Sequence, residues 1–385
     1  MPSELGDVRV TAVASGVVAL AALPLFLTGA MGVQIRAELG IGAAAFGLML
    51  SSFHVSSAFA SPRLGRATER LQPVKSLRWA VLLTSASLIG IALAGRSPGL
   101  YAGFLLLTGL GFALAQTATN LFVARTVAED RRATVLGITH AAIPFAALLA
   151  GLAVPAIAVT IGWRWAFVIG VGAAAIVRAG LPKSLAGSSG QASAGRRGSP
   201  SKELVALAVA ISLAAAGGSA LGAFLVSFAV ETGIGEAAAG VFLAAGASAG
   251  IAIRVISGWL ADRRSSHGYA GVVWLLTFGS GGYLLLLTEQ PALILVGAMV
   301  AFGGSLGWSG LLAHAIIEKN LDAPARATGV TQVGFYVGGG IGPPFYGLLI
   351  DHFSYRFAWS VAAGGVLLSA GLVLAVEMAS RDRRS

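Results

Sequence analysis

The feature that most constrains this chain is a series of long apolar runs with almost no charged side chains. A helix needs about 20 residues, at about 1.5 Å each, to cross the roughly 30 Å hydrocarbon core of a bilayer. Runs close to or above that length recur along the whole sequence, and one of them is interrupted, by Arg178. The runs lie at residues 10–35, 39–62, 79–95, 97–124, 133–163, 165–181, 204–230, 237–253, 265–288, 290–317, 327–350 and 357–376. The sequence therefore predicts twelve membrane-spanning segments.

These segments are predicted to be helices. Backbone groups in lipid must be hydrogen-bonded within a helix or around a closed barrel, and the runs lack the polar–apolar alternation of barrel strands. Glycine occupies 53 of the 385 positions. That many glycines would destabilise the helices of a soluble protein, but between membrane helices glycine permits close backbone approach. The predicted fold class is therefore an all-α membrane protein.

The charge balance fits the same prediction. Apolar residues make up 56% of the chain and charged residues 11%, and 26 Lys and Arg against 16 Asp and Glu give a net charge of +10. In a soluble protein this excess would suggest nucleic acid, but here the basic residues lie between the apolar runs, where bilayer topology explains them. The chain has no cysteine, which excludes disulfides and thiolate chemistry. No metal constellation, nucleotide motif or nucleophile elbow is present, so neither an enzyme nor a cofactor is predicted.

The distribution of basic residues predicts the orientation. If the amino terminus is cytoplasmic, the basic residues outside are Arg36, Arg96, Arg164 and Arg356, and the others except Arg254 fall on the cytoplasmic side. The asymmetry favours a multi-pass protein of the cytoplasmic membrane with both termini inside. The start, MPSELGDVR, lacks the basic beginning of a signal peptide, so the first span is predicted to be retained.

One long polar stretch divides the spans six and six. Residues 187–202, GSSGQASAGRRGSPSK, have the composition of a flexible linker, predicted to be cytoplasmic. The predicted domains are an amino-terminal six-helix bundle at 1–186, a linker at 187–203 and a carboxy-terminal six-helix bundle at 204–385.

The two halves also resemble each other in sequence. Arg132-Ala-Thr corresponds to Arg326-Ala-Thr at an offset of 194. At an offset of 193, a Gly, an acid and an Arg recur, as Gly65, Glu69 and Arg70 and again as Gly258, Asp262 and Arg263. Offsets that agree this closely indicate two homologous bundles.

On these residues the chain resembles a major facilitator superfamily transporter. The resemblance implies two pseudo-symmetric six-helix bundles that expose a central site alternately to either side, usually as a monomer in the lipid bilayer. It also implies a gating role for the repeated motif: Gly65 and Gly258 let neighbouring helices approach at the cytoplasmic face. The acid near each glycine, Glu69 or Asp262, contacts the amino terminus of a neighbouring helix and a basic residue, and these contacts lock the outward-open state. Arg70 and Arg263 belong to the same motif, and Glu69 departs from the usual Asp.

Arg254 is the sharpest candidate for a substrate contact. It lies roughly 10 Å from the cytoplasmic edge, counted from Ala261, and no Asp or Glu lies centrally in any span. The spacing Arg, three residues, Gly, three residues, Asp-Arg resembles oxalate/formate exchangers and monocarboxylate transporters, in which this arginine binds the substrate carboxylate. The alternative is a topology or gating charge that snorkels to the interface. The span at 327–350 lacks the second cation of the oxalate exchangers, which favours a monoanion.

The other candidate contacts are uncharged polar or histidine side chains within spans. His54 and His140 are either proton-responsive cavity groups or neutral histidines bonded to a carbonyl. Gln116 with Asn120, and Gln332 with Tyr336, are pairs one helical turn apart that either contact substrate or form interhelical hydrogen bonds.

The predicted function is transport of a small organic anion, of the kind carried by monocarboxylate or cyanate permease relatives. Without an intramembrane carboxylate, the open coupling modes are histidine protonation, the substrate's own proton, exchange and uniport. Two alternatives stay open: an exporter of drugs or amphipathic metabolites, and a membrane sensor or scaffold that retains a transporter fold.

Overall fold

The computed structural model describes residues 4–182, 201–263, 269–309, 311–312, 315–316 and 324–382, and within these ranges the chain is helical and contains no strand. The helices of the first half are α1 (Glu4–Ala30), α2 (Gly32–Leu39), α3 (Ala43–Leu71), α4 (Pro73–Leu93), α5 (Pro98–Thr126), α6 (Glu129–Ala153), the π-helix η1 (Val154–Ala158), α7 (Val159–Ile161) and α8 (Trp163–Gly180). Those of the second half are α9 (Lys202–Glu231), α10 (Glu236–Arg263), α11 (Ala270–Leu286), α12 (Pro291–Gly307), α14 (Pro324–His352) and α15 (Tyr355–Asp382).

Each predicted run overlaps a described helix. Among the described residues, nine helices are long and apolar enough to cross a membrane. The apolar helices α11 and α12 are shorter, and α8 has Arg164 and Arg178 near its two ends, which lower its mean hydropathy. The all-α membrane fold is therefore confirmed, with nine of the twelve predicted spans meeting the length and hydropathy of a crossing helix.

Two runs are broken in ways that the sequence analysis did not predict. Run 10–35 ends as a span at Ala30, and a separate helix, α2, follows Met31. Run 133–163 widens into the π-helix η1 at Pro155. Proline has no N–H to donate to the preceding turn, and such a gap is readily accommodated by a π-bulge.

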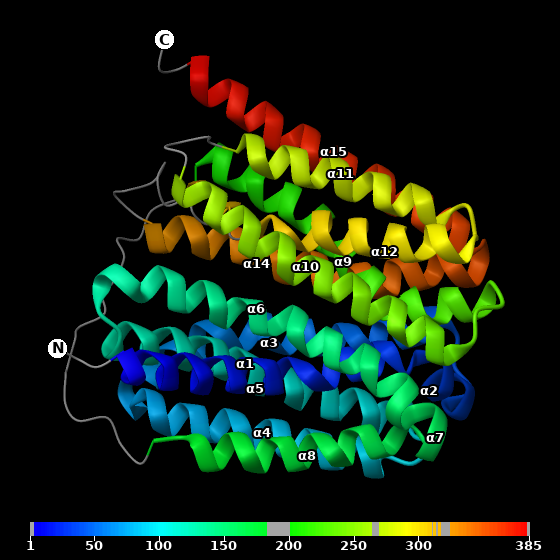
Figure 1. The fold of residues 1–385 in the computed structure, drawn as a ribbon, viewed down its shortest axis with the longest axis horizontal. Helices are drawn as coiled ribbons and strands as arrows, with labels where there is room; N and C mark the ends of the chain where they lie inside the picture. Colours follow the sequence, from blue (N-terminus) through cyan, green and yellow to red (C-terminus); the bar gives the residue numbers. More distant parts are fainter. Residues whose placement is uncertain are drawn as a thin grey trace.

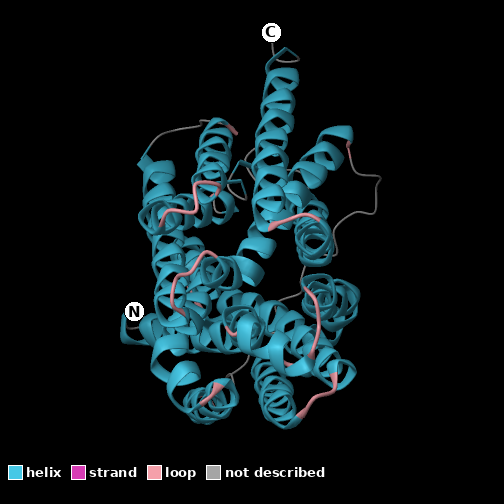
Figure 2. Cartoon of the chain, turned by 90° about the vertical axis from the view of Figure 1, so that its right-hand side faces the viewer, coloured by secondary structure: helices cyan, strands magenta, loops and turns pink. Residues whose placement is uncertain are grey.

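The helices form two groups that correspond to the two halves of the sequence. Figure 1 shows α1–α8 below and α9–α15 above, with both chain ends at the left. We call this left end the terminal side, and the right end, where α2 and α7 lie, the far side. Seen end-on in Figure 2, the same two groups stand one above the other. Their facing helices pair as α1 with α9, α3 with α14 and α6 with α10.

Glycines bring the two groups into backbone contact near the far side. A Cβ atom on Gly29 of α1 would lie 2.4 Å from the carbonyl oxygen of Gly222 on α9. One on Gly47 of α3 would lie 2.2 Å from the Pro343 oxygen on α14, and one on Gly151 of α6 would lie 2.6 Å from the nitrogen of Ala244 on α10. All three are shorter than any real Cβ contact, so each facing pair depends on a glycine.

Candidate functional site

A cavity of about 100 Å³ lies between the two groups. Helices α1, α3, α5 and α6 line it from the first half, and α9, α10, α12 and α14 from the second. Most of the lining is apolar, with five phenylalanine rings, and Arg254 is its one charged residue within the part of the chain described. The aromatic lining residues are Phe26, Phe53, Phe112, Phe302, Phe335 and Tyr336.

Arg254 lines this cavity from α10. Its Nη1 atom donates a hydrogen bond of 3.1 Å to the backbone carbonyl oxygen of His140 on α6. The bond crosses from one half of the protein to the other.

His54 lines the same cavity from α3. It is 6% exposed, and its ring stands edge-on to that of Phe53 at a centroid distance of 5.1 Å. A Cβ atom on Gly339 of α14 would lie 2.6 Å from the imidazole Nδ1, so the absent side chain at this position makes room for the ring. Nδ1 is buried and has no hydrogen-bond partner among the described atoms. The imidazole therefore has one nitrogen free for a proton or a ligand.

Tyr336 lines the cavity from α14, and it too lies at a contact between the halves. On α3, which packs against α14, the Ser61 hydroxyl donates a hydrogen bond of 2.6 Å to the backbone oxygen of Ser57. In the sequence repeat, Ser61 occupies the position of Arg254, 193 residues earlier. Of the two equivalent positions, Arg254 bonds across the halves to His140, and Ser61 bonds within its own helix.

The other predicted contacts do not line the cavity in this state. His140 contributes its backbone oxygen, and its half-buried side chain lies outside the lining. Gln332 is exposed, and on α5 Gln116 is half-buried and Asn120 exposed. The two α5 residues follow Phe112 at four-residue intervals, so they continue its face of the helix from the cavity toward the terminal side.

The predicted gating residues lie at the terminal-side ends of two helices. Gly65, Glu69 and Arg70 belong to the last turns of α3, and Gly258, Asp262 and Arg263 to those of α10. Their side chains lie outside the described part of the structure. The backbone shows α3 beside α14 and α10 beside α6.

Polar contacts that close the far side were missed by the sequence analysis. The Asp351 carboxylate at the end of α14 accepts hydrogen bonds of 2.8 Å from the backbone nitrogens of both Ala43 and Ala44, at the start of α3. The Gln34 side chain of α2 donates a hydrogen bond of 2.8 Å to the Glu236 carboxylate at the start of α10. A carboxylate at a helix amino terminus satisfies unpaired N–H groups and favours the helix dipole.

A sequence signal for this region did exist. The segment AELGIGAAA at 37–45 recurs as VETGIGEAA at 230–238, at the same offset of 193. In each copy the first glycine takes a left-handed conformation, with φ of 63° at Gly40 and 89° at Gly233. Each copy ends a helix and begins the next on the far side, where the two halves meet.

The described residues contain no group of three or more His, Asp or Glu side chains that would hold a metal ion. The central cavity instead offers one guanidinium, one imidazole and one phenol within an aromatic wall. Such a set can bind a small ligand by charge, hydrogen bonds and apolar contact.

Solved structures of the same architecture are known. The chain is similar to a bacterial homologue of the human lysosomal transporter Spinster, solved in an inward-facing and occupied conformation, with a TM-score of 0.74, 16% identity, and 98% of each chain covered. It is also similar to a variant of the nucleoside transporter NupG, with a TM-score of 0.75 and 12% identity, covering 96% of this chain and 99% of that one. At these identities the likeness shows the fold.

Sequence comparison adds a curated relative and a family. A protein of Bacillus subtilis (strain 168) named YwtG, described as a candidate metabolite transporter, is 27% identical over 131 residues. The match covers 34% of this chain and 28% of that protein, so less than a third of the relative is spanned. The family model described as Major Facilitator Superfamily matches residues 13–340 and, in a second match, residues 207–385. The chain, with its two helix groups around a central cavity, therefore belongs to the Major Facilitator Superfamily.

Proposed function

We propose that this protein transports a small organic monoanion across the cytoplasmic membrane by alternating access. One observation carries the proposal: Arg254 is the charged residue of a mostly apolar cavity between the two halves, among the residues described. A cation in a low-dielectric site attracts an anion strongly, and a guanidinium matches a carboxylate with two parallel hydrogen bonds.

The size of the cavity also supports a small substrate. About 100 Å³ is well below the 300–1,000 Å³ typical of sites for drug-sized ligands. A single lining cation balances one negative charge and leaves a second charge of a dicarboxylate unpaired in an apolar site, which is costly. These features favour a short monocarboxylate or a similar monoanion.

A second candidate function is export of drugs or amphipathic metabolites. The specific observation in its favour is the ring of five phenylalanines, which suits a larger apolar ligand. This function predicts that loss of Arg254 is tolerated. A sensor or scaffold, in contrast, predicts that no compound is transported.

Alternating access requires two bodies that move against each other. We propose residues 1–186 and 204–385 as these bodies, 187–203 as the cytoplasmic linker, and both termini as cytoplasmic, which makes the terminal side the inner face. The far-side contacts between α1 and α9, α3 and α14, and α6 and α10 support a conformation closed to the outside.

For coupling, we propose His54 as the proton-responsive group. The cavity lining contains no Asp or Glu among the described residues, and His54 has an unpartnered nitrogen. If transport is coupled to protons, the neutral His54→Gln variant is expected to retain exchange of substrate. It should lose the accumulation of substrate that a pH gradient drives.

The proposal is tested with purified protein in proteoliposomes loaded with unlabelled compound. We expect labelled pyruvate to enter by counterflow faster than oxalate, and a cation such as tetraphenylphosphonium to enter no faster than it enters protein-free liposomes. A thermal-shift screen with the same compounds should rank them in the same order. Protein-dependent entry of the cation would favour the exporter over the anion transporter. Protein-dependent entry of none of the three compounds would favour the sensor.

Replacing Asp351 with alanine is expected to loosen the far side. The carboxylate caps two N–H groups of α3, and a cap of this kind stabilises by about 0.5–2 kcal/mol. The ratio of closed to open protein should therefore fall about two- to thirtyfold. The chain has no cysteine, so spin labels on Arg96→Cys and Gln290→Cys, in far-side loops of different halves, report the change as a longer interlabel distance. Glu289→Gln, an exposed far-side acid, is the matched control, and an unchanged distance in Asp351→Ala would contradict the capping role.

A further inference from the structure

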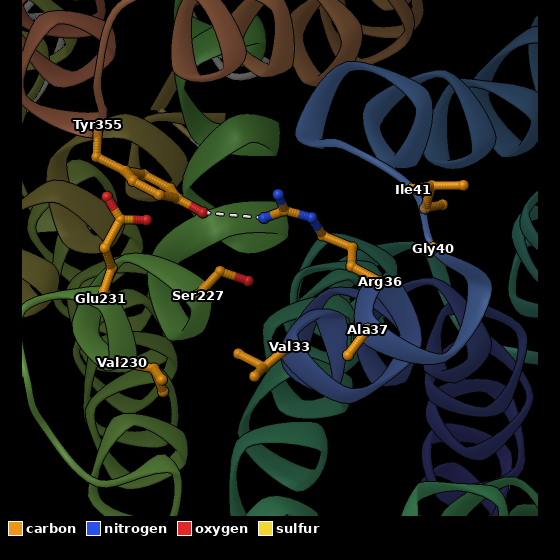
Figure 3. Close-up of a pocket in the computed structure, with 9 residues that line it drawn as sticks. All are labelled: Val33, Arg36, Ala37, Gly40, Ile41, Ser227, Val230, Glu231 and Tyr355. Carbon is orange, nitrogen blue, oxygen red and sulfur yellow. Dashed lines mark hydrogen bonds between the residues drawn. The ribbon is translucent and has the colours of Figure 1, made fainter.

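A second cavity, of about 530 Å³, opens on the far side. Helix α2 of the first half forms one wall, and the end of α9 with the start of α15 from the second half forms the other. Its polar residues are Arg36, Ser227, Glu231 and Tyr355, and Figure 3 shows the Arg36 guanidinium pointing across the cavity to the Tyr355 hydroxyl. That hydrogen bond, from Nη1, is 3.1 Å long.

The two sequence repeats carry equivalent acids, Glu38 in the first half and Glu231 in the second, in different surroundings. In the first half, Glu38 accepts hydrogen bonds of 2.9 Å from the Trp163 indole and 2.6 Å from Arg164. The bond from Arg164 is the main reason why the pKa of Glu38 lies below its usual value. Glu38 is thus held by its own half of the protein.

The equivalent residues of the second half are arranged differently. Glu231, Tyr355 and Arg356 stand where Glu38, Trp163 and Arg164 stand in the first half, at offsets of 193 and 192. Arg356 instead pairs with Glu289 at 3.7 Å, and the Tyr355 hydroxyl accepts from Arg36. Within the described ranges, the Glu231 carboxylate forms no ion pair or hydrogen bond, and it faces the cavity.

The opposite charge in the cavity is also incompletely paired. Arg36 has Ala229 as its repeat counterpart, so this cation is an addition to one half. Its Nε atom and the Ser227 Oγ atom are buried without a hydrogen-bond partner among the described residues. Buried unpaired donors cost free energy that an acceptor from a ligand would recover.

We propose that this cavity is a second ligand site, which takes a small zwitterion of the amino acid type. The carboxylate of the ligand binds Arg36, with the Ser227 and Tyr355 hydroxyls beside it, and its ammonium group binds Glu231. Because Arg36 belongs to one half and the other three residues to the other, the ligand bridges the halves. Binding therefore favours the conformation closed on the far side and slows transport without competing for the central cavity.

The site is tested by thermal unfolding of the full-length protein with three probes: β-alanine, propionate and n-propylamine. The Arg254→Ala background removes the central cation, so anion binding there does not contribute, and a failure of this test leaves the proposed function untouched. We expect β-alanine to raise the unfolding midpoint more than propionate and n-propylamine together. Arg36→Gln and Glu231→Gln should each weaken the apparent affinity for β-alanine by about tenfold or more.

Two matched controls and one charge-neutral variant complete the test. Arg356→Gln and Glu289→Gln remove an exposed cation and acid on the same side without touching the cavity, and should leave the response to β-alanine unchanged. Ala37→Phe fills the cavity from its exposed wall and should abolish the response while the charges stay. Equal stabilisation by propionate alone, no stabilisation by β-alanine, or a full response in Ala37→Phe would each overturn the proposal.

Discussion

Replacing Arg254 with alanine is expected to abolish counterflow of the anionic substrate while the protein still inserts and folds. The guanidinium is the charged group of the cavity among the described residues, and a hydrogen bond to a charged group stabilises by about 1.5–3 kcal/mol. Substrate affinity should therefore fall by about tenfold to more than a hundredfold. Arg254→Lys should recover little of this loss, because an ammonium keeps the charge without the planar fork that binds a carboxylate through two bonds.

Stability separates a substrate role for Arg254 from a structural one. The residue also bonds to the His140 carbonyl across the two halves, so a purely structural arginine would lower the unfolding midpoint of the substrate-free protein when it is replaced. We expect instead that the unfolding midpoint of the substrate-free Arg254→Ala protein is nearly unchanged and that pyruvate no longer raises it. Arg96→Ala, in an exposed far-side loop, is the control for loss of a cation. Wild-type counterflow by Arg254→Lys would count against carboxylate binding.

The second large effect is expected from two glycines, Gly29 and Gly47. In the double alanine variant, each new Cβ atom would lie 2.4 Å or less from a backbone oxygen of the other half. Overpacking of this kind costs about 1–3 kcal/mol at each site. Because neither oxygen can move without its helix, the cost falls on the closed far side and shifts the protein toward the outward-open conformation.

The shift is measurable as a longer distance between labels on Arg96→Cys and Gln290→Cys, with counterflow reduced about tenfold or more. Gly103→Ala is the matched control, since a Cβ atom at that position of α5 meets nothing within 4 Å. It should leave both distance and flux unchanged. Normal flux with an unchanged distance in the Gly29→Ala/Gly47→Ala variant would show that these contacts do not control the far side.

The central cavity was partly predictable from sequence. Arg254, His54 and Tyr336, which the sequence singles out as candidate contacts, line it, because a polar side chain inside a span has few sites other than a cavity or a partner helix. Gln116, Asn120 and Gln332 are equally polar but lie outside the lining. They share helices with residues that do line the cavity, Phe112 on α5 and Tyr336 on α14, and differ from these in depth along the helix. Whether a given depth along a helix lies beside the cavity depends on where the opposing helices come into contact. The sequence of a single helix does not contain that information.

The far side was not predicted at all. Asp351 lies 308 residues from the backbone nitrogen of Ala43 that it caps, and in the sequence it is only an acid at the end of an apolar run. Arg36 was assigned to topology, as an outside charge, because nothing local connects it with Tyr355 or Glu231. Only the packing of α2 against α9 and the start of α15 brings these three residues to one cavity.

The sequence by itself determined the membrane fold, the helix order, the twofold repeat and the half of the protein that carries Arg254. It did so because the hydrocarbon core imposes a length limit and excludes charge from each span separately, so every segment can be interpreted alone. The tertiary structure decided which charges meet, which glycines touch and where the chain leaves a cavity. These depend on the contact of helices from opposite halves, in which the partner of each residue lies a hundred or more positions away.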